Sequence, residues 1–77
     1  MKTLLEYIIK NIVKEPKKVT VEEENADNIV KLKVTADKED IGTIIGKQGR
    51  VIKAIRELVK VKAIKQNKYL EIQILEK

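Results

Sequence analysis

The residues with the clearest chemical potential are Gly46, Lys47, Gln48 and Gly49, which form a G-x-x-G turn. Lys47 offers an ammonium group and Gln48 an amide, and both can donate hydrogen bonds to phosphate oxygens. Gly46 can adopt a positive φ, and Gly49 lets another molecule approach the backbone closely. A helix that begins after the turn adds the partial positive charge of its first N–H groups. These features predict a turn that holds phosphates, and a simple helix C-cap is the alternative.

Positive charge is concentrated from this turn onward. Between residues 47 and 68 the chain carries eight basic residues and one acidic residue, a net charge of +7 within a total of +5. The basic residues are Lys47, Arg50, Lys53, Arg56, Lys60, Lys62, Lys65 and Lys68. Such a patch is typical of a protein that binds a polyanion, and a solvated lysine-rich surface is the alternative.

The composition argues against an enzyme. The 77 residues include no cysteine and no histidine, which removes disulfides, thiolate nucleophiles, the usual zinc ligands and His-based proton transfer. Asp37, Glu39 and Asp40 are explained as acidic residues at a helix start, where the helix dipole favours negative charge. No nucleophile stands beside a base. We therefore expect no catalytic residue, no metal site and no cofactor.

Hydrophobic periodicity indicates a first helix from about Lys2 to Lys14. Its apolar stripe consists of Leu4, Leu5, Ile8, Ile9, Ile12 and Val13. Thr3 and Glu6 have the spacing of a capping box, and Pro16 is expected to stop the helix.

Two strands that form a hairpin are predicted next. Val19 and Val21 alternate with polar residues, and a second alternating run extends from Val30 to Ala36. The turn formers at residues 25–28 connect them. Three glutamates at positions 22–24 fit an exposed sheet edge, where charge resists further strand pairing.

Two helices flank the G-x-x-G turn. Asp37 is expected to cap the first helix and Gly46 to end it, and the second begins near Gly49 or Arg50. The second helix has an apolar arc of Val51, Ile52, Ile55, Leu58 and Val59 and an opposite basic arc of Arg50, Lys53, Arg56 and Lys60.

A closing strand, with Leu70, Ile72 and Ile74 alternating with other residues, can return parallel to the strand before the helices. The predicted fold is α+β, in the order helix-strand-strand-helix-helix-strand. A three-stranded mixed sheet carries the helices on one face, and residues 1–77 form one domain.

The run Ile44-Ile45-Gly46-Lys47-Gln48-Gly49-Arg50-Val51-Ile52-Lys53-Ala54-Ile55 resembles the KH-domain signature I-I-G-x-x-G-x-x-I-x-x-I. The preceding helix and strand are similar to the type II order of that fold. Over essentially its whole length the chain resembles the KhpA family of small, single-domain bacterial RNA-binding proteins.

This resemblance implies single-stranded RNA as the ligand, because the G-x-x-G loop of a KH domain clamps about four nucleotides by their backbone. The implied RNA-binding residues are Gly46, Lys47, Gln48, Gly49, Arg50, Lys53, Ile45 and Ile52. Ile41, Ile45 and Ile52 could form the apolar floor of the groove or belong to the core. Tyr7 and Tyr69 are the only aromatic residues, so we expect weak sequence selectivity and affinity that depends on phosphates.

The resemblance also implies a homodimer, and a possible heteromer with KhpB, also called Jag. The implied role is that of a post-transcriptional regulator or RNA chaperone. The alternative is a protein-interaction subunit whose RNA binding is secondary. Ala54 and Val61 lie outside the main apolar arc of the second helix and could contact a partner chain. Leu58 borders that arc, and we expect it to pack in the core. Charges interrupt the apolar residues of Met1–Val13, and no run is long enough to span a bilayer, so we expect a cytoplasmic protein.

Overall fold

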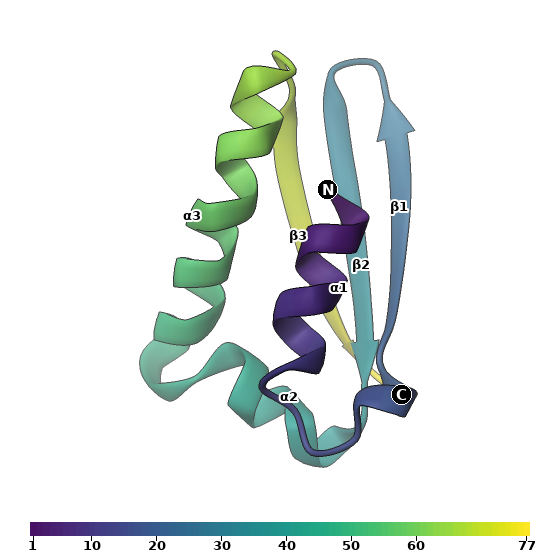
Figure 1. Ribbon diagram of the computed structural model, residues 1–77, viewed down its shortest axis with the longest axis vertical. Helices are drawn as coiled ribbons and strands as arrows, with labels where there is room; N and C mark the ends of the chain where they lie inside the picture. Colours follow the sequence, from purple (N-terminus) through teal and green to yellow (C-terminus); the bar gives the residue numbers. More distant parts are fainter.

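The computed structural model describes residues 1–77 and has the predicted order of elements (Figure 1). The helices are α1 (Lys2–Lys10), α2 (Lys38–Ile45) and α3 (Arg50–Lys65), and the strands are β1 (Thr20–Ala26), β2 (Ile29–Ala36) and β3 (Tyr69–Glu76). Two short 3-10 turns, η1 (Pro16–Lys18) and η2 (Lys47–Gly49), complete the chain. The α+β fold class predicted from the sequence is confirmed.

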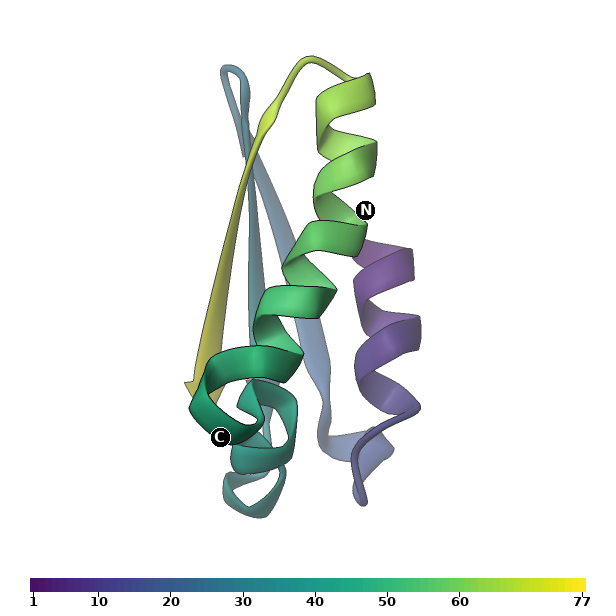
Figure 2. The same cartoon turned by 90° about the vertical axis from the view of Figure 1, so that its left-hand side faces the viewer.

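The three strands form one mixed sheet in the order β1-β2-β3. β1 pairs antiparallel with β2, and β2 pairs parallel with β3, with Leu32 opposite Ile72. The parallel return of the closing strand is thus confirmed, and α2 and α3 supply the long crossover that a parallel pair requires. The helices lie on one side of the sheet, and the other side is uncovered (Figure 2).

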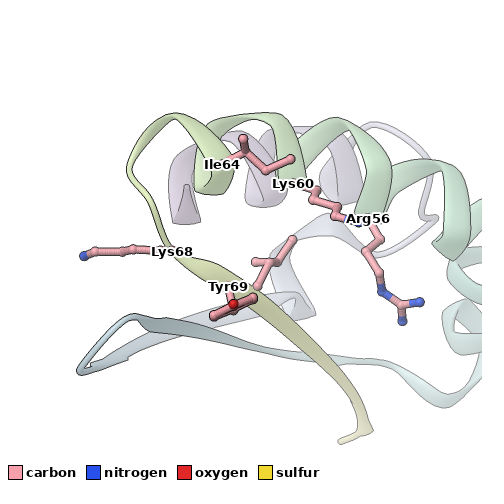
Figure 3. Close-up of a pocket in the computed structure, with 6 residues that line it drawn as sticks. Arg56, Lys60, Ile64, Lys68 and Tyr69 are labelled. Carbon is pink, nitrogen blue, oxygen red and sulfur yellow. The ribbon is translucent and has the colours of Figure 1, made fainter.

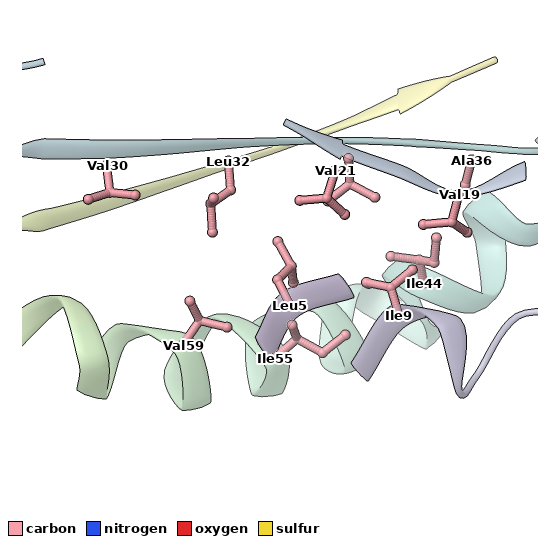
Figure 4. Close-up of a cluster of buried hydrophobic side chains, with 11 residues drawn as sticks. Leu5, Ile9, Val19, Val21, Val30, Leu32, Ala36, Ile44, Ile55 and Val59 are labelled. Atoms are coloured by element: carbon pink, nitrogen blue, oxygen red, sulfur yellow. The ribbon is translucent and has the colours of Figure 1, made fainter. Parts of the chain in front are cut away.

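The core fills the space between the sheet and the helices, where side chains from both layers point toward one another (Figure 4). The central strand β2 contributes Val30, Leu32, Val34 and Ala36, all fully buried. The helices contribute Leu5, Ile9, Ile44, Ile55 and Val59. Each helix buries one stripe only, so its outer face remains at the surface. None of the helices is both long enough and apolar enough to cross a membrane.

The hairpin is tighter than its turn formers indicated. Asn25 and Ala26 remain in β1, and only Asp27 and Asn28 connect the strands. Asp27 has a φ of 54°, a left-handed conformation that Asp tolerates better than most residues. β1 is an edge strand and carries the three glutamates, as predicted.

α1 is shorter than the periodicity predicted. It ends at Lys10 rather than near Lys14, because the Asn11 side chain competes for the helix backbone. Its Nδ2 donates a hydrogen bond to the Tyr7 carbonyl at 2.7 Å. The helical pattern of the following residues is overridden by a tertiary hydrogen bond, which the Lys14 backbone N–H donates to the Asp40 carboxylate.

The predicted capping box at the start of α1 is wrong. Thr3 makes no capping hydrogen bond, and Glu6 pairs instead with Lys10, one turn further on, at 3.5 Å. The cap comes from β1, where the Glu23 carboxylate accepts a hydrogen bond from the Lys2 backbone N–H at 3.0 Å. Glu23 is therefore more than an edge charge, because it ties α1 to the sheet at the positive end of the helix dipole.

Candidate nucleic-acid interface

The G-x-x-G turn joins α2 to α3 at one end of the molecule (Figure 1). Gly46 has φ 77° and ψ 174°, a conformation essentially confined to glycine. A Cβ atom at residue 46 would collide with the Val51 side chain and lie 2.9 Å from the Val51 backbone nitrogen. The positive φ predicted for Gly46 is confirmed, and its missing side chain lets the start of α3 pack closely against the end of α2.

Gly49 differs from Gly46 in its surroundings. Its φ of 74° is also left-handed, but a Cβ atom built on it meets no atom within 4 Å. The backbone at Gly49 is therefore open to another molecule on that side. Gln48 between them is also left-handed, with φ 57°, which costs a residue with a Cβ about 1–2 kcal/mol. Strain of this kind is enriched in functional turns.

Positive charge gathers around this open backbone. Lys47, Arg50 and Lys53 are exposed, and the three ion pairs of the chain involve none of them. The N–H groups of Gly49 and Arg50 donate within the turn, to the carbonyls of Gly46 and Lys47. α3 has no acidic residue in its first turn, so no carboxylate competes for the N–H groups that follow. The turn thus brings exposed cations and a helix N-terminus together at one surface.

The isoleucines near the turn differ in how deeply they are buried. Ile44 is fully buried in the core, whereas Ile45 is 37% exposed beside Gly46. Ile41 and Ile52 are half-buried and pack against the core from outside. Ile45 is therefore a surface residue, and Ile41 and Ile52 lie at the boundary between surface and core.

Asp40 anchors α2, and this role could not be read from the sequence. Its side chain is 1% exposed, and its two oxygens accept hydrogen bonds from the backbone N–H groups of Lys14 and Glu15, each at 3.0 Å. Asp40 lies in the first turn of α2, as predicted, but its carboxylate links this helix to the segment before Pro16. No spacing rule indicates a partner 25 residues away.

Asp37 occupies the predicted N-cap position of α2 without capping it through its side chain. Its carboxylate lies instead 4.0 Å from the Lys18 ammonium, and its carbonyl accepts the first backbone hydrogen bonds of the helix. The position was predicted correctly, and the side-chain hydrogen bond was not.

The outer face of α3 is more apolar than predicted. Leu58 is 60% exposed and Val61 is 52% exposed, so the expectation that Leu58 packs inside is wrong. The helix buries the line Ile55, Val59 and Ala63, in steps of four residues, which leaves Leu58 about 100° away around the helix. Ala54 is exposed on the same outer face.

Both surface pockets of the molecule lie toward the other end of α3, away from the turn. The larger one, of about 340 Å³, lies between α3 and β3 (Figure 3). Residues 46–49 line neither pocket. The sequence predicted that Arg56 and Lys60 lie on a basic face of the helix. It did not predict that β3 would form a pocket with this face.

Comparison with protein families and relatives shows which proteins the chain is similar to. The family model described as "KhpA/KhpB, KH domain" matches residues 2–74. The RNA-binding protein KhpA of Clostridium perfringens is 44% identical over 75 residues, covering 97% of this chain and 100% of the relative. KhpA of Chlamydia trachomatis is 43% identical (99% and 97% covered), and KhpA of Listeria monocytogenes is 40% identical (99% and 100% covered).

Solved structures resemble the fold at lower identity. Aquifex aeolicus Era bound to GDP and AlF4⁻ superposes with a TM-score of 0.69 at 21% identity. Era in complex with MgGDPNP and a segment of 16S ribosomal RNA gives the same values. Each match covers 99% of this chain and 30% of the Era chain, so the likeness concerns one part of a larger protein.

The names of the curated relatives describe RNA binding and no enzymatic activity, which supports the expectation of a non-enzymatic protein. The family match spans nearly the whole chain, and three relatives are at least 40% identical to it over almost their full length. The chain therefore belongs to the KhpA family of KH-domain proteins.

Proposed function

We propose that this chain binds single-stranded RNA by its sugar-phosphate backbone at Gly46–Gly49. The observation that carries the proposal is the open backbone at Gly49, which lies at the start of α3 among cations that have no ion-pair partner. Phosphate oxygens suit both the N–H groups and the cations of this site. The relatives named RNA-binding protein KhpA support RNA as the source of those phosphates.

Within this proposal each side chain has a defined part. Lys47 and Gln48 donate hydrogen bonds to phosphate oxygens, and Arg50 and Lys53 attract the neighbouring phosphates. Ile45 and Ile52 offer an apolar surface to the bases beside the turn. These contacts read the backbone more than the base edges, so sequence selectivity is weak. Residues 1–77 act as one KH domain of a cytoplasmic post-transcriptional regulator or RNA chaperone.

The proposal is tested by replacing Lys47 and Gln48 together with Asp. Both side chains are exposed, so we expect an unchanged melting temperature and at least about a tenfold loss of affinity for a single-stranded RNA. Fluorescence anisotropy with a labelled oligonucleotide at moderate salt measures the affinity, and circular dichroism follows the melting.

A matched control separates the site from the overall charge. Lys17→Asp with Lys77→Gln lowers the net charge by the same three units at exposed positions outside the turn. We expect this control to weaken binding much less. Wild-type affinity in the Lys47→Asp/Gln48→Asp variant would contradict the clamp.

A second function, pairing with another protein chain, is favoured by the exposed apolar residues of α3. Leu58 and Val61 lie one helical turn apart on the outer face, and burying two such side chains stabilises an interface. The partner we propose is a second copy of this chain, with KhpB as the alternative. Sedimentation of Leu58→Glu should give a monomer where the wild type gives a dimer, and a monomeric wild type would contradict the homodimer.

A further inference from the structure

The outer face of the helix layer carries exposed apolar side chains on both α1 and α3. These helices lie side by side, and no further element covers them on the side away from the sheet (Figures 1 and 2). On α1, Tyr7 is 68% exposed and lies about 160° around the helix from the buried Leu5 and Ile9. On α3, Leu58 and Val61 are also exposed. Leu58 and Val61 therefore belong to a surface that spans two helices.

Helix geometry determines toward which neighbour Leu58 points. α3 packs over β3 and α1 over β1, so one flank of α3 faces the free edge of β3 and the other faces α1. The buried line of α3 includes Val59, and successive residues are about 100° apart. Arg56 and Lys60 lie on one side of this line and border the pocket beside β3 (Figure 3). Leu58 lies on the other side, which is the flank toward α1.

The two flanks of α3 differ in charge. The flank beside β3 carries Arg56 and Lys60, whereas the flank toward α1 carries the uncharged residues Ala54, Leu58 and Val61. These three residues follow one another at spacings of four and three, which forms a continuous apolar stripe along a helix. The stripe is thus the part of α3 that a polyanion has least reason to contact.

A second copy of this chain fits the stripe. Each copy has a net charge of +5, so two copies approach most easily where cations are sparse. A two-fold arrangement with antiparallel α3 helices places Leu58 of each copy against Val61 of the other. It also places Ala54 against Lys65, and the small alanine leaves room for the lysine stem. A parallel arrangement would instead bring the two basic turns next to each other.

Antiparallel pairing leaves the RNA side of each copy open. Lys60 lies about 160° around the helix from Leu58, and the turn lies at the end of α3. From Arg50 to the middle of the stripe α3 rises about 14 Å, so the two turns lie about 28 Å apart along the helices. That distance corresponds to about eight stacked nucleotides at roughly 3.4 Å each. A strand of four nucleotides therefore reaches one turn, and a much longer strand reaches both.

We propose that a second copy of this chain covers the α1–α3 face, including Tyr7, and that the resulting dimer holds one long RNA strand with both turns at once. This inference rests on the proposed RNA clamp and on the proposed pairing through α3, and it deepens both. It adds Tyr7 to the pairing surface and makes RNA affinity depend on strand length. Two linked sites raise affinity through effective concentration, without any new contact to the RNA.

Tyrosine fluorescence tests the pairing face, because the chain has two tyrosines and no tryptophan. Tyr69→Phe leaves Tyr7 as the only fluorophore, and acrylamide quenching measures its access to solvent. In this background and without RNA, Leu58→Glu should raise the quenching constant of Tyr7 at least about twofold, because the partner no longer covers it. Ile64→Glu is the matched control, since Ile64 is also 60% exposed but borders the pocket beside β3. It should leave the quenching of Tyr7 unchanged.

RNA affinity provides the second readout, with oligouridylates of four and thirty nucleotides. Leu58→Glu should weaken binding of the long strand at least about tenfold and that of the short strand less than about twofold. Ile64→Glu controls for the added charge and should affect both strands alike. An equal effect of Leu58→Glu on both strands would overturn binding by two turns.

Three further results would overturn the pairing face itself. The first is a wild type that sediments as a monomer at every concentration. The second is equal quenching of Tyr7 in the presence and absence of Leu58→Glu. The third is protection of Tyr7 that appears only when RNA is added, which would identify RNA as the molecule that covers this face.

The failures of the proposals are distinguishable. Unchanged RNA binding in Lys47→Asp/Gln48→Asp overturns the clamp and binding by two turns, whereas the protection of Tyr7, which needs no RNA, still reports the pairing face. Loss of RNA binding in that double variant, together with an equal effect of Leu58→Glu on both strands, overturns binding by two turns and leaves the clamp standing.

Discussion

At the scale of single residues, the two glycines of the turn have separate physical roles. Gly46 is required by packing, because Val51 occupies the space that its Cβ would need. Gly49 is required by conformation and by access, because its φ is left-handed and its Cβ would point into open space. The sequence alone presents them as equivalent members of one motif.

This difference predicts different effects of the same substitution. Gly46→Ala should destabilise the fold by more than about 2 kcal/mol, through the combined cost of the glycine-only conformation and the collision with Val51. Gly49→Ala should cost about 1–2 kcal/mol for its left-handed φ, and should weaken RNA binding at a temperature where the variant is folded. Urea unfolding and anisotropy measure the two effects, and equal losses of stability would contradict the assignment.

At the scale of elements, the turn depends on how α2 is held. Asp40 fixes the start of this helix to the chain before Pro16, and Gly46 ends it against α3. The turn is therefore positioned from both sides by contacts that involve no ligand. This preorganisation lowers the conformational entropy lost on binding.

Removal of the Asp40 carboxylate should be costly. Asp40→Ala leaves the N–H groups of Lys14 and Glu15 without their partner, and each such loss costs about 1–3 kcal/mol. We expect a melting temperature at least about 8 °C lower, whereas the exposed neighbour in Glu39→Ala should change it much less. Equal melting temperatures for the two variants would show that Asp40 is no anchor.

Glu23 gives the fold a dependence on pH. The hydrogen bond from Asn25, followed by that from the Lys2 backbone N–H, lowers the pKa of Glu23 below its ordinary value of 4.5, and burial opposes them. A lowered pKa means that the stabilisation is complete above pH 4.5 and is lost as the pH falls through the folded-state pKa.

Glu23→Gln should therefore lower the free energy of unfolding at pH 7 by about 0.5–1 kcal/mol and have little effect near pH 3. Urea unfolding at both pH values checks this, with Glu24→Gln as the exposed control. If Glu23→Gln and the wild type differed in free energy of unfolding by the same amount at pH 3 as at pH 7, the charge of Glu23 would be excluded as the cause.

Local pattern predicted the elements correctly and their ends less well. Periodicity placed every helix and strand, because each buries one face against a single core. The predicted helix ends were wrong where a residue distant in sequence supplied the hydrogen bond. Glu23, and not Thr3, caps the start of α1, and Asp40 binds the Lys14 N–H that the predicted helix would have included. Periodicity also could not distinguish Leu58 from Val59, because adjacent positions on a helix border the same apolar arc until packing fixes the rotation.

For the candidate site, the sequence supplied the residues of the turn and the structure supplied their surroundings. The motif predicted the positive φ of Gly46, but only the fold reveals that Ile45 is at the surface and Ile44 is in the core. The pocket beside Tyr69 could not be predicted, because it depends on how closely β3 approaches α3.

At the scale of the whole molecule, the basic helix α3 and the acidic edge strand β1 lie on different parts of the surface. The sheet and helices share one core, and the charge of +7 between residues 47 and 68 lies along α3 and the turns at its two ends. The acidic edge β1 lies across the sheet from β3. The densest positive charge, and hence the strongest attraction for a polyanion, is therefore expected along α3.

Salt should weaken RNA binding by an amount that counts phosphate contacts. With Lys47, Arg50 and Lys53 each neutralising one phosphate, the logarithm of the binding constant should fall with the logarithm of salt concentration with a slope of about −2 for a four-nucleotide strand. Lys47→Gln should reduce that slope by about 0.7. An affinity that does not change between low and moderate salt would contradict binding by phosphates.

The most direct measurement is the response of the backbone amide resonances of the ¹⁵N-labelled protein to a four-nucleotide single-stranded RNA. If the turn holds the RNA backbone, the largest chemical-shift changes occur at Gly46 to Ile52, where the open backbone meets the start of α3. Changes confined to α1 or to the uncovered face of the sheet, with residues 46–52 unmoved, would contradict it.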